Sequence, residues 1–156
     1  MDTIGQICVL LEKKKEKFND YEKYTLEMLH CGADDIENYI TQRAEIATEI
    51  DELTEEIGRI CDGEANGDVF FRTASSKINY DEVPPELHPV FEAGQQVRSV
   101  ANRILQSEKQ VLERLESLKE EARSKIRENQ NLPKIKKYLS DLGDQPTDGN
   151  LTNGKA

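Results

Sequence analysis

The stretch "IENYITQRAEIATEIDELTEEIGRI", residues 36–60, decides the fold because its apolar residues recur at alternating intervals of three and four. This spacing is typical of an amphipathic α-helix that packs against other helices along a heptad-like seam. Only Arg43 interrupts it. The seam consists of Ile36, Tyr39, Arg43, Ile46, Ile50, Leu53, Ile57 and Ile60.

Two other segments have the same periodicity, and no useful run of period two occurs anywhere in the chain. The first seam runs through Ile4, Ile7, Leu11, Lys14, Phe18, Tyr21, Thr25 and Met28. The last runs through Val97, Ala101, Ile104, Glu108, Val111, Leu115, Leu118 and Ala122, with only Glu108 out of pattern. The sequence therefore predicts an all-α fold, an elongated antiparallel bundle or coiled coil of three long helices.

Glycine and acidic residues indicate where the first two helices end and begin. Gly32 is expected to end the first helix in the left-handed conformation. Asp34 is expected to cap the second helix, with Glu37 at capping-box spacing. The second helix should end near residues 61–63, where "CDG" is followed by further turn-forming residues.

The connection over residues 64–85 is predicted to be a loop with a short turn at "FFRTASSK". Phe70 and Phe71 are expected to fold back and cover the end of the helical hairpin. "VPPE" should open the third helix, since proline suits a first turn, and Pro89 is expected to delay or kink that start.

The C-terminal part is predicted to contain a short helix and then a disordered tail. Pro133 should end the third helix, and "PKIKKYLSDL", residues 133–142, has the pattern of a short final helix. Residues 143–156 contain one large apolar residue, which is too little to order them. We therefore expect one helical-bundle domain over residues 1–142 and a tail over residues 143–156.

The composition limits both the core and the partners. Charged residues make up 33% of the chain and aromatic residues 6%, with a net charge of −10. This balance predicts a narrow helical core and no binding to nucleic acid, which requires a basic surface. Residues 34–63 hold ten acids and two bases, so this segment forms either a solvated helix face or a surface for a basic partner.

No motif for catalysis or for a cofactor occurs, and a calcium-like motif is incomplete. "RICDGEANGDVFFRT", residues 59–73, has the acid and glycine spacing of a calcium loop. The twelfth position counted from Asp62 is Thr73, where a bidentate glutamate is needed. Cys8, Cys31 and Cys61 form no CxxC pair, and His30 and His88 are too few for a structural zinc site. We expect no metal, no cofactor and no enzymatic activity.

The start of the chain does not have the pattern of a signal peptide, because the short apolar run "ICVLL" is followed by "EKKKEK". No segment approaches the roughly 18 apolar residues of a membrane span. Three unpaired cysteines fit a reducing compartment. We therefore expect a cytoplasmic protein.

The third predicted helix is longer than the two that can pack against it, about 65 Å against about 40 Å each. Its unpartnered apolar stripe would continue into the C-terminal part. A second copy of the chain or a helix from another protein could cover it. The stripe consists of Leu118, Ala122, Ile126, Leu132, Ile135, Tyr138 and Leu139.

The order of three segments resembles FlgN-type flagellar export chaperones over about residues 4–140. These segments are "ICVLLEKKKEKFNDYEKYTLEML", "IENYITQRAEIATEIDELTEEI" and "VPPELHPVFEAGQQVRSVANRILQSEKQVLERLESL". The resemblance implies an ATP-independent chaperone that binds C-terminal helical segments of secreted hook–filament junction proteins, prevents their premature assembly and meets the export apparatus. It places client contact at Leu115, Leu118, Ala122, Ile126, Ile135, Tyr138 and Leu139. The alternative is a structural coiled-coil module that forms homodimers and has no client.

Overall fold

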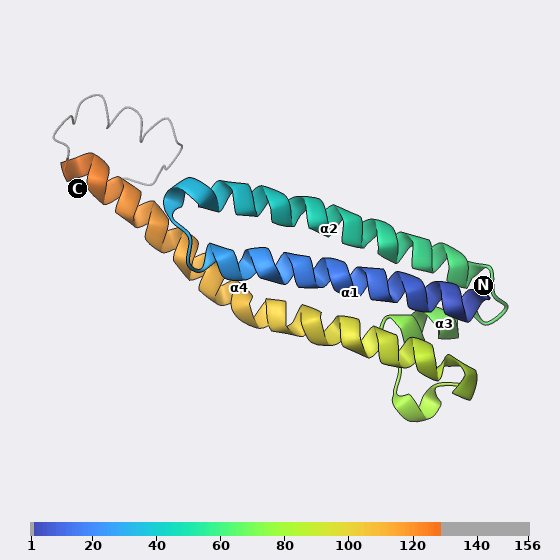
Figure 1. The fold of residues 1–156 in the computed structure, drawn as a ribbon. Coiled ribbons are helices and arrows are strands. Elements are labelled where there is room, and N and C mark those ends of the chain that lie inside the picture. Colours follow the sequence, from blue (N-terminus) through green and yellow to red (C-terminus); the bar gives the residue numbers. More distant parts are fainter. Residues whose placement is uncertain (1, 129–156) are drawn as a thin grey trace. The chain divides into compact units, whose positions relative to one another are not determined.

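A computed structural model describes residues 2–128, and within that range the chain is helical and contains no strand (Figure 1). The predicted all-α class is confirmed. The predicted short helix at residues 133–142 and the tail at 143–156 lie outside the described residues. The elements are α1 (Thr3–Met28), α2 (Ala33–Asp62), α3 (Gly67–Ala74), η1 (Tyr80–Glu82), η2 (Pro85–Leu87) and α4 (His88–Glu128).

The chain divides into two compact units, residues 1–114 and residues 115–156. In the first unit α1 and α2 form an antiparallel hairpin, and the first part of α4 runs beside α1 (Figure 1). Described by itself, the second unit contains the end of α4 as far as Glu128. The single domain over residues 1–142 stays a prediction.

The turn between α1 and α2 differs from the prediction. Gly32 has φ −84° and ψ 175°, so it is extended and serves as the N-cap of α2. A left-handed residue is not needed, because the amides of His30 and Cys31 both donate to the carbonyl of Glu27 and close the last turn of α1. Asp34 does not cap α2 but lies in its first turn, where the helix dipole favours a carboxylate.

The connection over residues 64–85 is more ordered than predicted, since it contains the eight-residue helix α3 and two short 3-10 helices. Phe70, Thr73 and Ala74 form the buried face of α3, at positions that share one side of a helix. Phe70 packs in the core and Phe71 packs against it, which confirms that the aromatic pair covers this end of the hairpin. α2 ends at Asp62, as predicted.

Two prolines position the start of α4. Pro85 begins η2, and α4 follows directly at His88. Pro89 lies in the first turn of α4, where its missing N–H has no intrahelical partner to lose. Tyr80 stacks on His88 with ring centroids 4.8 Å apart and meets Phe91 edge-on at 5.3 Å. The prolines therefore set the beginning of α4 after "VPPE" rather than breaking it.

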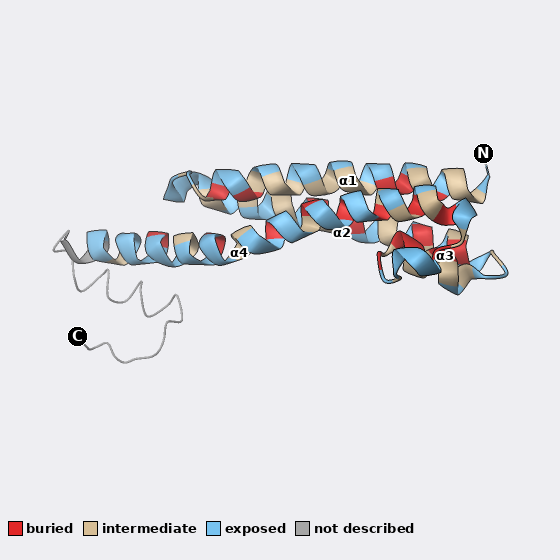
Figure 2. Cartoon of the chain, turned by 90° about the horizontal axis from the view of Figure 1, so that it is seen from below, coloured by how far each residue is buried: buried red, intermediate tan, exposed pale blue. Residues whose placement is uncertain are grey.

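Buried side chains gather at the end of the hairpin where α3 lies (Figure 2). The main core cluster consists of Ile7, Leu10, Leu11, Ile57, Cys61, Phe70, Ala74, Val83, Leu87, Val90 and Val97. Along the rest of the first unit the core narrows to single seam residues such as Ile46, Ile50 and Ile104. None of the helices within residues 2–128 has the length and apolar character needed to cross a membrane.

Candidate protein-binding surface

The structure describes the side chains of three of the seven residues predicted to contact a client. Leu115 is half-buried, Ala122 is exposed, and Leu118 is only 7% exposed. The burial of Leu118 corrects the expectation that the whole stripe is open. The side chain of Ile126 and all of Ile135, Tyr138 and Leu139 lie outside the described residues, so the seven are not shown as one surface.

The most exposed large apolar side chains of the first unit were missed by the sequence analysis. Leu105 and Leu112 of α4 are 68% and 63% exposed. Each follows a buried seam residue, Ile104 or Val111, and the two leucines are seven residues apart on one side of the helix. Their seven-residue repeat, one position after the seam residues, was the pattern in the sequence that could have predicted them.

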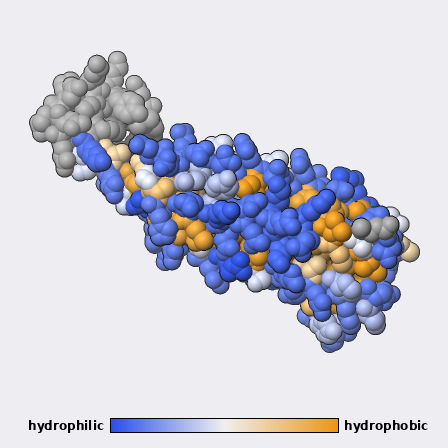
Figure 3. Space-filling model, viewed as in Figure 1, coloured by the Kyte–Doolittle hydropathy of each residue, from blue (hydrophilic) through white to orange (hydrophobic). Residues whose placement is uncertain are grey.

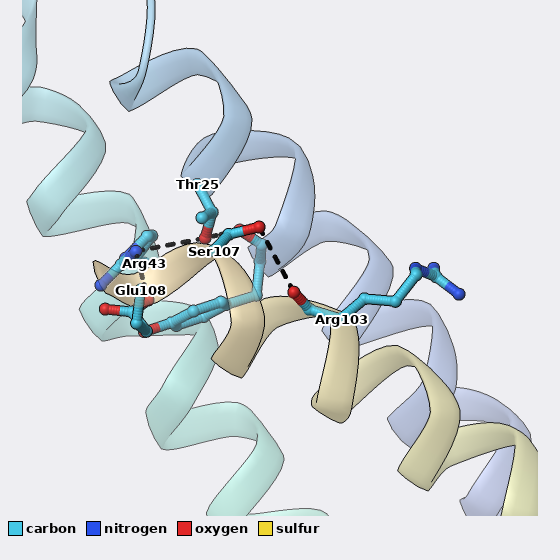
Figure 4. Close-up of polar contacts among 6 residues, drawn as sticks. Thr25, Arg43, Arg103, Ser107 and Glu108 are labelled. Carbon is cyan, nitrogen blue, oxygen red and sulfur yellow. Dashed lines mark hydrogen bonds and ion pairs between the residues drawn. The ribbon is translucent and has the colours of Figure 1, made fainter. Parts of the chain in front are cut away.

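Between these leucines on α4 lies Glu108, which pairs with Arg43 of α2 at an Nη1–Oε1 distance of 3.0 Å (Figure 4). These are the two residues that interrupted the predicted seams of their helices. Their side chains are 15% exposed for Arg43 and 31% for Glu108. The two polar interruptions therefore meet each other, and the ion pair lies where both seams would otherwise be apolar.

The Arg43 guanidinium has further partners on α1. Its Nη1 donates to the hydroxyl of Thr25 at 3.1 Å (Figure 4). That hydroxyl donates to the Tyr21 carbonyl at 2.9 Å. The guanidinium also lies 4.6 Å from the centre of the Tyr21 ring, within reach of a cation–π interaction. One cation thus joins α1, α2 and α4 at a single level, which favours one helix register over its shifted alternatives.

Three exposed apolar residues lie within one turn of this ion pair, each on the same helix as one of its partners. Ile40, 42% exposed, lies one turn before Arg43 on α2. Leu105 and Leu112 lie three residues before and four residues after Glu108, so they share its side of α4. We call Ile40, Leu105 and Leu112 the apolar strip.

Further polar links hold α4 against α1 and against the turn between α1 and α2. Arg103 donates to both carboxylate oxygens of Glu22, at 3.0 and 2.9 Å. The hydrogen bond and charge of Arg103 hold the pKa of Glu22 below its usual range. Arg114 donates to the carbonyl of Cys31 at 2.8 Å. α4 is therefore anchored on both sides of Leu105 and Leu112.

The outer face of α2 is strongly acidic. Of its two basic residues, Arg43 is committed to the ion pair with Glu108, and Arg59 is exposed. Glu49 pairs with Lys17 of α1 at 3.0 Å. All ten acids of this segment are exposed: Asp34, Asp35, Glu37, Glu45, Glu49, Asp51, Glu52, Glu55, Glu56 and Asp62.

Two open depressions lie between α1 and α2, with volumes of about 360 and 470 Å³. Both are lined mainly by charged side chains, among them Glu45, Glu49 and Lys17. Figure 3 shows the same character on the face turned to the viewer, where hydrophobic residues form separate small areas among hydrophilic ones. Such surfaces suit contact with another macromolecule better than enclosure of a small molecule.

The cysteine thiols are poor candidates for chemistry. Burial, together with Asp62 and Glu64, raises the pKa of Cys61 to about 11. Burial also raises the pKa values of Cys8 and Cys31. These thiols stay protonated at neutral pH, and the thiolate is the reactive form. Within residues 2–128 no group of three or more His, Cys, Asp or Glu side chains is placed to hold a metal ion.

Comparison of the chain with protein families, with curated proteins and with solved structures found no match.

Proposed function

We propose that the protein is an export chaperone of the FlgN type, which binds C-terminal helical segments of secreted flagellar hook–filament junction proteins before they assemble. Support comes from the order of the helical segments and from the surface of α4. The proposed activity is binding without catalysis, and the proposed place of action is the cytoplasm, before export.

One observation supports this proposal most strongly. α4 has 41 residues, against 26 for α1 and 30 for α2, and some of its apolar side chains are not buried. Leu115 and Ala122 form a row with a seven-residue interval along α4, and neither of them is buried. A helix with such a row is suited to bind another amphipathic helix, which would cover the exposed apolar area.

The physical consequence for a client is reversible protection. A client segment that becomes ordered on binding loses conformational entropy, which offsets part of the gain from burial. The resulting moderate affinity suits a chaperone that must release its client to the export apparatus without ATP. The proposed surface lies within residues 115–139, where Leu115 and Ala122 are its described members that are not buried.

The second candidate function is a structural module that oligomerises through α4. The seven-residue spacing of Leu105 and Leu112 favours it, because two such helices from two copies could form a coiled-coil seam. In that case the chain would have no client, and its exposed leucines would face a second copy.

Calorimetric titration with C-terminal segments of hook–filament junction proteins tests the first function. Ala122→Asp should weaken binding about tenfold or more, because it puts a charge into the proposed contact. Ser124→Asp is the matched control, since Ser124 is exposed and about 200° further around the helix. If no segment binds, or if both variants bind like wild type, the proposal is wrong; a concentration-dependent dimer that ignores every segment would favour the second function.

A further inference from the structure

The apolar strip of Ile40, Leu105 and Leu112 is exposed on helices that are otherwise well anchored. Its members flank the Arg43–Glu108 ion pair, whose 3.0 Å contact fixes α2 and α4 at this level. The exposure therefore belongs to the packed arrangement of the two helices. Leu105 and Leu112 are also two turns apart, so a partner helix could contact both at once.

The charges around the strip indicate what could cover it. Glu37 lies one turn before Ile40 and is exposed, as are the nine other acids of α2. Arg43 adds no free positive charge, because Glu108 neutralises it. Arg103 and Lys109 are the exposed bases of α4 within one turn of either leucine, and Arg103 is paired with Glu22. An occupant with basic flanks would thus gain favourable contacts with α2.

A second copy of the chain fits this surface less well. Each copy has a net charge of −10, so self-association would bring two acidic α2 helices close together. Like charges across an interface oppose association, and the three residues of the strip offer little apolar area to offset them.

We propose that the apolar strip is a docking site for an amphipathic helix of another polypeptide, with large apolar residues at three- and four-residue spacing and lysine or arginine on both flanks. The site belongs to the first compact unit and shares no residue with the client surface proposed at residues 115–139. The inference does not depend on the flagellar function.

The test uses the full chain and a synthetic 21-residue helix with leucine at heptad spacing and lysine at the flanking positions, about six turns in all. Fluorescence anisotropy of the labelled peptide reports binding. The first comparison is the double variant Leu105→Gln and Leu112→Gln, which should bind about tenfold more weakly or worse. The matched control is Val9→Gln, since Val9 is also an exposed apolar residue, 40% accessible, but lies near the N-terminal end of α1 and outside the strip.

A peptide with glutamate in place of lysine should bind far more weakly, and added salt should weaken binding of the lysine peptide. Thermal melting should change by only a few degrees in the double variant and in Val9→Gln, because the altered side chains are exposed. Equal binding to wild type and the double variant would overturn the inference. So would a wild-type dimer that the double variant dissociates, because the occupant would then be a second copy.

Discussion

The ion pair between Arg43 and Glu108 gives the sharpest stability prediction. Replacing Glu108 with leucine removes the carboxylate but leaves the guanidinium, only 15% exposed, with the Thr25 hydroxyl and the Tyr21 ring as partners. Replacing Arg43 with methionine leaves a carboxylate that is 31% exposed and can be hydrated. The loss of stability should therefore be larger for Glu108→Leu than for Arg43→Met.

The magnitude follows from the degree of burial. Breaking a fully buried pair costs about 3–5 kcal/mol, and a charged hydrogen bond contributes about 1.5–3 kcal/mol. Because both groups retain some solvent contact, we expect Glu108→Leu to lower the free energy of unfolding by about 1.5–3 kcal/mol. For a chain of this length that corresponds to a fall in Tm of about 3–12 °C.

The double variant Arg43→Met, Glu108→Leu should recover most of this loss, since an apolar pair of similar volume replaces two charges. Urea unfolding monitored by circular dichroism gives the four free energies of a double-mutant cycle. The reasoning fails if Glu108→Leu lies within about 0.5 kcal/mol of wild type, or if the two single losses simply add in the double variant.

Other predictions concern the packing of α3, the cysteines and the response to pH. Gly94→Ala should destabilise the protein by about 1–3 kcal/mol, because a Cβ there would lie 2.6 Å from the carbonyl oxygen of the last residue of α3. Gly58→Ala should instead stabilise it by about 0.5–1 kcal/mol, because the nearest atom to a Cβ at Gly58 is 3.8 Å away. Urea unfolding measures both changes. Cys61 is 1% exposed, so in a variant with the other cysteines changed to serine it should resist a thiol reagent at neutral pH. It should react fully once denaturant is added. Rapid labelling of the folded protein would contradict the burial of Cys61. Arg103 lowers the pKa of Glu22 from 4.5, so Glu22 stabilises the folded state above that pH and loses this effect as the pH falls through its folded-state pKa. The difference in unfolding free energy between wild type and Glu22→Gln should therefore shrink in that acidic range. A difference that stays constant with pH would argue against the Arg103–Glu22 pair.

The three long helices could be predicted because their seams have enough repeats to show a period. α3 could not be predicted, since its eight residues form only two turns. Its start also depends on a close approach between its first residue and the end of α2. A Cβ at Gly67 would collide with the carbonyl oxygen of Cys61, so glycine is what permits α3 to begin so soon after α2. That contact depends on the folded arrangement and leaves no periodic signal.

The candidate surface was only partly predictable for a related reason. The sequence showed that Arg43 and Glu108 each interrupt a seam, but their pairing depends on how far α2 and α4 are shifted along each other. The same shift decides which apolar residues stay exposed. Leu118, a member of the predicted stripe, is buried, whereas Leu105 and Leu112, each one position after a seam residue, are exposed.

The most direct test of the proposed client binding is amide hydrogen exchange of the full chain with and without a C-terminal segment of a hook–filament junction protein. We expect the segment to slow exchange in α4 from about residue 115 onward, and to leave the amides of α3 unchanged. Unchanged exchange throughout α4 at saturating segment would contradict the account. The account would also be contradicted if, without any segment, protection of α4 from exchange increased with the concentration of the protein itself.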